Sequence, residues 1–124
     1  MMKWGLLFLA GGVGTLARYL LSGVVYQVLG SRFPYGTLMI NLLGCFLIGF
    51  LVALSQEKFL MSENTKLFLM IGFIGAFTTF STFIFETANL IKVGQIFAAF
   101  FNVVLSVVVG FLFFELGIFL GKII

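Results

Sequence analysis

The sequence predicts an all-α membrane protein whose four helices cross the bilayer as a single transmembrane domain, residues 1–124. Two observations carry this prediction. Of the 124 residues, 62% are hydrophobic and only 9% are charged, whereas a soluble domain carries roughly 25% charged residues. The uncharged stretches also recur at lengths near the ~20 residues that a membrane-crossing helix needs. We therefore expect spans near residues 4–23, 34–55, 67–90 and 94–121.

The composition excludes several classes of function. There is no histidine, which removes the commonest general base and metal ligand. The single cysteine, Cys45, excludes an intrachain disulfide and a multi-cysteine metal site. The net charge of +3 lacks the clustered Lys and Arg of a nucleic-acid surface, so no nucleic-acid partner is expected. Because no nucleophile–base pair or metal cluster is visible, we predict that the chain is not an enzyme.

The basic residues are divided almost evenly between the two sides of the membrane. With four spans, the N-terminus, the second loop and the C-terminus share one side, which holds Lys3, Lys58, Lys66 and Lys122. The other side holds Arg18, Arg32 and Lys92. The positive-inside rule then gives almost no bias. Two interpretations stay open: one weakly preferred orientation, or insertion in both orientations, which favours an antiparallel homodimer with two-fold symmetry.

Polar residues in the first two spans each allow two interpretations. Arg18 can extend its charge to the membrane interface, or it can attract an anion at a pore vestibule. In the second span, Thr37 and Asn41 are four residues apart and share a helix face. The Asn41 amide can donate two hydrogen bonds and accept two. It therefore suits either a hydrogen bond between helices or a polar pathway.

The third span has the densest polar signal. Two glycines precede a run of hydroxyl side chains: Gly72, Gly75, Thr78, Thr79, Ser81 and Thr82. Glycine weakens a helix, and Ser and Thr compete for its backbone hydrogen bonds. We therefore expect this helix to be broken near mid-membrane. The carbonyls that end the first half of a broken helix favour a cation, and the N-terminus of the second half favours an anion.

Three residues after the expected break also have alternative interpretations. Phe80 and Phe83 are three residues apart and share a face. Most phenylalanines of a membrane protein face lipid, but the positive edge of a phenyl ring can also face a small anion. Glu86 is either an interfacial charge near Lys92 or the continuation of a polar path from Thr82.

The fourth span carries a stripe of small and polar residues. Asn102, Ser106 and Gly110 follow one another at intervals of four residues in a helix that is otherwise rich in Val, Leu and Phe. Small residues let helices approach closely, so the stripe serves either packing or a pathway.

With these residues in place, the sequence resembles the Fluc/CrcB family of bacterial fluoride channels over essentially its whole length. Four stretches carry the resemblance: Gly11 to Tyr19 with its glycine run and Arg18; Gly36 to Gly49 with Thr37, Asn41 and Gly44; the string Thr78-Thr79-Phe80-Ser81-Thr82-Phe83; and Glu86-Thr87 followed by Leu90. The glycine run alone is a weak signal. The asparagine motif and the third-span string, in this order within a four-span chain, are strong.

The resemblance implies a passive fluoride channel in the bacterial cytoplasmic (inner) membrane, built as an antiparallel dual-topology homodimer with two pores. It implies a structural Na⁺ at the dimer interface, held by the backbone carbonyls of Gly75 and Thr78. It places Arg18 at the vestibule and assigns these residues to the fluoride pore: Thr37, Asn41, Phe80, Ser81, Thr82, Phe83, Glu86, Asn102 and Ser106. Some relatives carry a tyrosine where this chain has Asn102, so that residue departs from the family pattern.

An alternative is a small dual-topology multidrug-type transporter coupled to protons. Such an exporter of cations needs a buried carboxylate in its first helix. The first span here contains neither Asp nor Glu, which weighs against this alternative.

Overall fold

The computed structural model describes residues 1–124, and the chain is helical except for its connecting loops and one short interruption. It contains four helices that are long and apolar enough to cross a membrane: Met2–Leu29, Tyr35–Glu57, Glu63–Lys92 and Ile96–Ile123. The prediction of an all-helical chain with four long apolar helices is thereby confirmed. At about 1.5 Å per residue, each of these helices exceeds the ~30 Å thickness of a bilayer's hydrocarbon core.

Three of the four spans are continuous helices. The first is α1 (Met2–Leu29). The second is α2 (Tyr35–Val52), which continues as a π-helical turn, Ala53–Glu57. The fourth consists of α6 (Ile96–Val104), a π-helical turn (Leu105–Val109) and α7 (Gly110–Ile123).

The third span is divided by a short non-helical stretch. It begins with α3 (Glu63–Lys66), continues through π-helical residues Leu67–Ile74 and reaches α4 (Gly75–Phe77). Thr78 is then extended, with φ −88° and ψ 160°. Helix α5 (Ser81–Lys92) begins after three intervening residues, 78–80.

Several helices begin or end at residues that favour helix termini. Ser62 caps α3, because its hydroxyl accepts a hydrogen bond of 3.2 Å from the backbone N–H of Thr65. Pro34 directly precedes α2, where its missing N–H costs nothing. Gly30 and Gly94, which follow α1 and α5, both have φ of +85°, a conformation that glycine adopts without steric cost.

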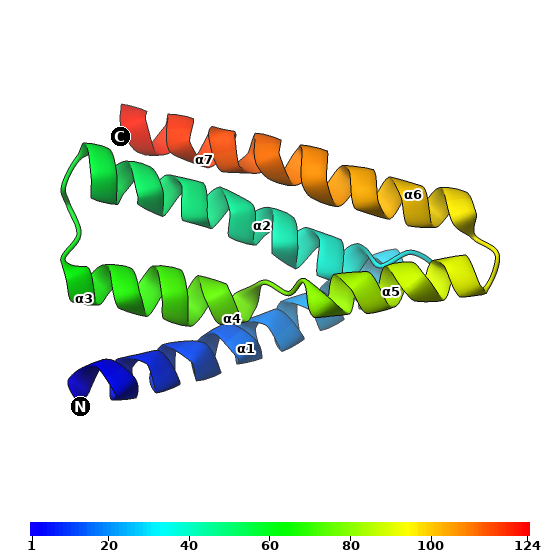
Figure 1. The fold of residues 1–124 in the computed structure, drawn as a ribbon, viewed down its shortest axis with the longest axis horizontal. Helices are drawn as coiled ribbons and strands as arrows, with labels where there is room; N and C mark the ends of the chain where they lie inside the picture. The colour runs from blue at the N-terminus through cyan, green and yellow to red at the C-terminus, as the bar shows by residue number, and fades with distance from the viewer.

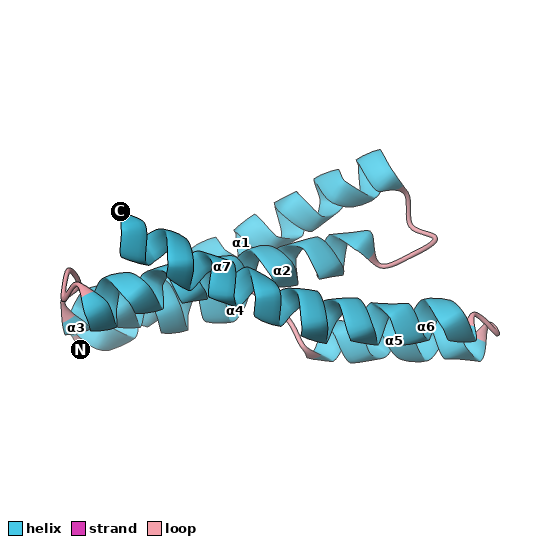
Figure 2. Ribbon diagram, turned by 90° about the horizontal axis from the view of Figure 1, so that it is seen from above, coloured by secondary structure: helices cyan, strands magenta, loops and turns pink.

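The four spans lie side by side as an up-and-down bundle (Figure 1). Both termini lie at the same end of the bundle as the loop between α2 and α3, and the other two loops lie at the opposite end. At that opposite end, the pair α1–α2 diverges from the pair α5–α6 (Figure 2).

Glycines allow the backbones of neighbouring spans to touch. Gly49 of α2 faces the backbone of Phe114, and Gly117 of α7 faces the backbones of Phe46 and Phe50. A side chain at either glycine would collide with these backbone atoms. Membrane helices gain no hydrophobic driving force from one another, so such close van der Waals contact is a main source of their association.

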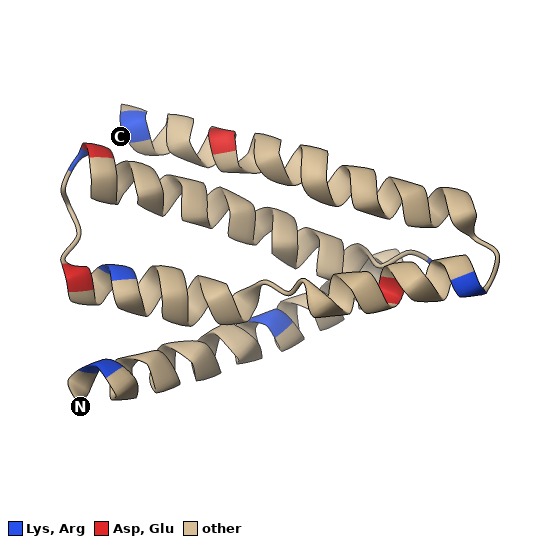
Figure 3. Cartoon of the chain, viewed as in Figure 1, with Lys and Arg blue, Asp and Glu red and all other residues tan.

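The outside of the bundle is apolar. Only 23 of the 124 residues are buried, and large hydrophobic side chains are exposed along all four spans. Most charged residues lie toward the two ends of the bundle, although a basic segment also lies about midway along α1 (Figure 3). An ion pair of 3.1 Å between Lys122 and Glu57 joins two spans at the end that carries the termini. This surface belongs to a multi-pass membrane protein.

We predict that Gly117→Val lowers the free energy of unfolding by about 1–3 kcal/mol, because the new side chain forces α7 away from α2. Thermal unfolding in detergent measures the effect. Gly5→Val is the matched control, since nothing lies within 4 Å of a Cβ placed at Gly5. Equal melting temperatures for the two variants would show that the spans do not pack as described.

Candidate functional site

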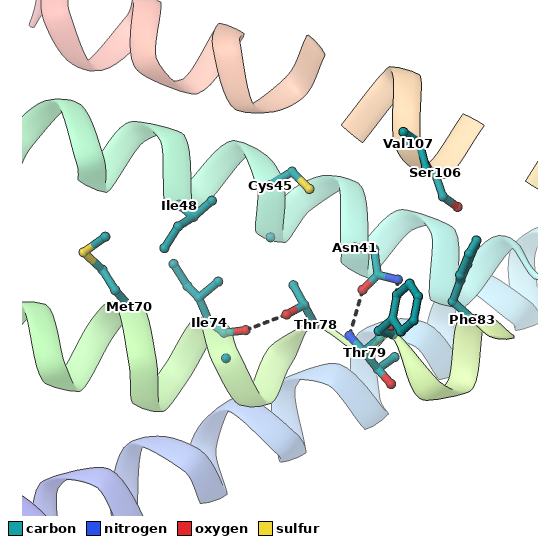
Figure 4. Close-up of a pocket in the computed structure, with 13 residues that line it drawn as sticks. Asn41, Cys45, Ile48, Met70, Ile74, Thr78, Thr79, Phe83, Ser106 and Val107 are labelled. Carbon is teal, nitrogen blue, oxygen red and sulfur yellow. Dashed lines mark hydrogen bonds between the residues drawn. The ribbon is translucent and has the colours of Figure 1, made fainter. Parts of the chain in front are cut away.

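Asn41 holds the interruption of the third span. Its Nδ2 donates a hydrogen bond of 2.9 Å to the carbonyl oxygen of Thr79, and its Oδ1 accepts one of 2.8 Å from the backbone N–H of Thr79 (Figure 4). One amide side chain thus replaces both backbone partners that Thr79 lacks outside a helix. The second N–H of Asn41 makes no hydrogen bond.

Hydroxyl groups satisfy other groups around the same interruption. The Thr78 hydroxyl donates to the Ile74 carbonyl at 3.0 Å. The Thr79 hydroxyl accepts a hydrogen bond of 3.3 Å from the backbone N–H of Thr82 and donates one of 3.0 Å to the Thr82 hydroxyl, so Thr79 satisfies a backbone N–H in the first turn of α5. Gly44 of α2 makes room for Thr78, because the Thr78 methyl group lies where a Cβ would be.

Two carbonyl oxygens next to the interruption remain without a partner. No hydrogen bond ends on the carbonyl oxygen of Gly75 or on that of Thr78. The donors that would pair with them in a continuous helix are diverted or absent, since the Thr79 N–H is bonded to Asn41. Neutral carbonyl oxygens of this kind are ligands for a hard monovalent cation.

A central cavity of about 460 Å³ lies between α2, the third span and the fourth span. Its lining includes Asn41, Phe80, Phe83 and Ser106, together with Gly75 and Thr78; Figure 4 draws all 13 lining residues and labels ten of them. The rings of Phe80 and Phe83 are 5.7 Å apart between centroids and tilted by 38°. The hydroxyl of Ser106 is buried and has no hydrogen-bond partner. A buried hydroxyl without a partner is costly, and here it lines a cavity that a ligand can enter.

A second cavity of about 300 Å³, the polar cavity, lies between α1, α2 and the third span. Its lining contains Arg18, Thr37, Thr82 and Glu86. The Thr37 hydroxyl donates a hydrogen bond of 2.7 Å to Oε1 of Glu86. Neither Arg18 nor Lys92 forms an ion pair with Glu86. Glu86 is therefore engaged by neutral donors within the bundle.

Two predicted site residues lie outside both cavities. Ser81 is exposed at the start of α5. Asn102 is only 2% exposed, and its Nδ2 donates a hydrogen bond of 2.9 Å to the hydroxyl of Thr87. Thr87 in turn donates to the carbonyl of Phe83 at 2.7 Å. The Asn102 amide thus joins α6 to the turn of α5 that carries Phe83.

Three residues of these networks were not predicted from the sequence to have a role: Tyr26, Thr79 and Thr87. Tyr26 donates a hydrogen bond of 3.3 Å to Oε2 of Glu86, which lies 60 residues further along the chain. No pattern in the sequence links two residues at that separation. Thr79 and Thr87 belong to the polar strings Thr78 to Phe83 and Glu86-Thr87, so the sequence contains a signal from which a role for both could have been predicted.

Comparison with known proteins places this arrangement in a family. The family model described as CrcB-like protein, Camphor Resistance (CrcB) matches residues 5–118. The chain belongs to this family. The match includes the whole of the second and third spans, most of the first and fourth, and every residue that lines the two cavities.

Curated relatives of the CrcB-family chain share its length. A protein of Solidesulfovibrio magneticus is 46% identical over 122 residues, which cover 98% of each chain. One of Geobacter sp. (strain M21) is 50% identical over 100 residues, 81% of each chain. One of Dehalococcoides mccartyi is 43% identical over 120 residues, 96% of this chain and 92% of the relative. All three are named fluoride-specific ion channel FluC.

We predict that Asn41→Ala lowers the free energy of unfolding by about 2 kcal/mol, because the backbone N–H and carbonyl of Thr79 both lose their partner inside the bundle. Thermal unfolding in detergent measures the loss. Asn89→Ala is the control, since the Asn89 side chain is exposed and makes no hydrogen bond. A loss no larger than that of Asn89→Ala would contradict the bracing role.

Proposed function

We propose that the chain is a fluoride-selective ion channel that lets fluoride leave the cell passively across the bacterial cytoplasmic (inner) membrane. The observation that carries this proposal is the central cavity, where the unpaired hydroxyl of Ser106 shares a lining with Asn41, Phe80 and Phe83. The names of the relatives support it. They describe channels, which agrees with the prediction that the chain is not an enzyme.

Fluoride is small and strongly hydrated, so a pathway must replace its water. In the proposed mechanism Ser106 donates its free hydroxyl hydrogen, and Asn41 donates the N–H that Thr79 does not use. The positive ring edges of Phe80 and Phe83 add weak electrostatic stabilisation. No Lys or Arg lines the central cavity. Fluoride is therefore held weakly enough to leave again, as conduction requires.

The remaining polar residues extend this route or support it. Thr37, Thr82 and Glu86 continue it through the polar cavity, with Arg18 as the cationic group that attracts the anion. Ser81 supplies a further exposed hydroxyl at the start of α5. Asn102 contributes by holding Thr87 and the turn that carries Phe83, because its amide is already bonded to Thr87.

The proposed channel is an antiparallel homodimer with two pores. Phe80 is 75% exposed in the single chain although it lines the central cavity. A second copy would cover this ring and close the cavity. The four-to-three division of basic residues between the two sides supports insertion in both orientations. Two oppositely inserted copies then meet about a two-fold axis in the membrane plane.

A structural Na⁺ fits the free carbonyls of Gly75 and Thr78. Neither oxygen accepts a hydrogen bond within the chain, and no acidic side chain lines the cavity that they border. In the proposed dimer the interrupted third spans of both copies meet at mid-membrane, so that each contributes this pair of oxygens. The ion would neutralise the four carbonyl dipoles that the interrupted backbones leave without a hydrogen-bond donor.

The proposed role is protection against fluoride. Fluoride enters cells as its neutral weak acid and dissociates inside, so a passive exit lowers its cytoplasmic concentration. A proton-coupled multidrug exporter, the alternative function, has no observation in its favour. Helix α1 contains no Asp or Glu that could carry the proton.

Reconstituted liposomes loaded with fluoride test the function directly. We predict that the purified protein releases fluoride and retains chloride, with efflux followed by ion-selective electrodes. Ser106→Ala should lower the fluoride efflux rate about tenfold or more, because it removes the one buried hydroxyl without an internal partner. Ser55→Ala is the control, since the Ser55 hydroxyl is bonded to the Val52 carbonyl in the same span and Ser55 lines neither cavity. Absence of fluoride efflux from correctly folded protein would refute the function.

Insertion in both orientations has its own test. In a Cys45→Ser background, we predict that Met2→Cys, an exposed position whose substitution leaves every basic residue in place, is labelled by a membrane-impermeant thiol reagent in about half of the molecules from each side. The expected cause is the near balance of basic residues across the membrane. Adding two lysines to the loop at 58–62 should make the labelling one-sided. If the protein without the added lysines is labelled from one side only, dual topology is contradicted.

A further inference from the structure

Tyr26 and Glu86 form a wall between two cavities. The polar cavity contains both residues, together with Arg18, Thr79 and Thr82. A third cavity of about 530 Å³, the outer cavity, also contains both. The outer cavity lies against the loops at the end of the bundle, where its lining includes Arg32, Asn89 and Gln95. Arg18 therefore lies in the polar cavity and Arg32 in the outer cavity, and the Glu86 carboxylate lies between the two cavities.

The hydrogen bonds in this wall engage both oxygens of that carboxylate. Thr37 donates to Oε1 of Glu86 at 2.7 Å, and the phenol of Tyr26 donates to Oε2 at 3.3 Å. The backbone N–H of Thr37 donates in turn to the Tyr26 oxygen at 3.5 Å. Three spans, α1, α2 and α5, thus meet at a single carboxylate.

The packing around Tyr26 keeps its ring against α2. Gly36 precedes Thr37, and carbon atoms of the Tyr26 ring occupy the space that a Cβ at Gly36 would need. Gly36 itself is buried, and Tyr26 is half-buried. The phenol is therefore held beside Glu86 by a contact that only glycine at position 36 allows.

We propose that Tyr26 is a positioning residue for anion conduction, acting through Glu86. This proposal rests on the proposed channel function. A free carboxylate oxygen repels an anion that passes from the outer cavity to the polar cavity. By donating a hydrogen bond to Oε2 of Glu86, the Tyr26 phenol keeps that oxygen directed toward itself and away from an anion that moves between the two cavities. The anion then meets Arg32 before the wall and Arg18 behind it.

Fluoride efflux from liposomes tests the effect of removing the phenol hydroxyl. Tyr26→Phe should lower the efflux rate about three- to tenfold, the range expected for one lost hydrogen bond. Tyr35→Phe is the matched control: it makes the same chemical change at a tyrosine that packs against Phe33 and makes no side-chain hydrogen bond. Efflux through Tyr26→Phe at the wild-type rate would overturn the proposal.

A double-mutant cycle separates positioning from a merely structural role. If Tyr26 acts through Glu86, adding Tyr26→Phe to Glu86→Gln should change efflux no further. An equal fractional loss of efflux in both backgrounds would overturn the proposal.

If Glu86→Gln is itself inactive in transport, infrared spectroscopy tests whether Tyr26 contacts the Glu86 carboxylate. The chain has only four acidic residues, all Glu, so subtracting the Glu86→Gln spectrum isolates the Glu86 band.

The infrared measurement does not depend on transport. The Glu86 band should shift in Tyr26→Phe and stay unchanged in Tyr35→Phe; an unshifted band in Tyr26→Phe would overturn the proposal. Wild-type liposomes that fail to release fluoride would instead refute the channel function. The two failures are therefore distinguishable.

Discussion

The pair of hydrogen bonds between Asn41 and the backbone of Thr79 is the constraint on which the rest of the site depends. Within a bilayer no water is present to satisfy a backbone that leaves the helix, so another part of the protein must do so. Because Asn41 supplies both a donor and an acceptor, the third span can stop at Phe77 and resume at Ser81. The free carbonyls of Gly75 and Thr78, and the place of Phe80 and Phe83 in the central cavity, follow from that interruption.

Helix α2 is shaped to serve the site on two sides. Gly44 admits Thr78 of the interrupted span, and Gly36 admits the ring of Tyr26 from α1. Between these glycines lie Asn41, which faces the central cavity, and Thr37, which faces the polar cavity. One helix thus carries polar side chains to both cavities. Its glycines bring the neighbouring spans close enough for those side chains to reach their partners.

Composition and the lengths of the uncharged runs were enough to predict four helical spans, because a bilayer constrains segment length and polarity strongly. The side-chain partners could not be predicted. Asn41 and Thr79 are 38 residues apart, and Tyr26 and Glu86 are 60 apart. Such pairs depend on how the helices pack. The same reason applies to Asn102, which the resemblance placed in the pore and whose amide is bonded to Thr87 in this chain. The pore, sodium and dimer assignments stay predictions.

The central claim is that amide, hydroxyl and ring-edge groups in an uncharged cavity conduct fluoride and exclude chloride. Current through a planar bilayer with fluoride on one side and chloride on the other tests it most directly. We predict a current whose reversal potential follows the fluoride gradient and does not respond to the chloride gradient. A reversal potential set by chloride or by protons, or the absence of fluoride current from folded protein, would contradict it.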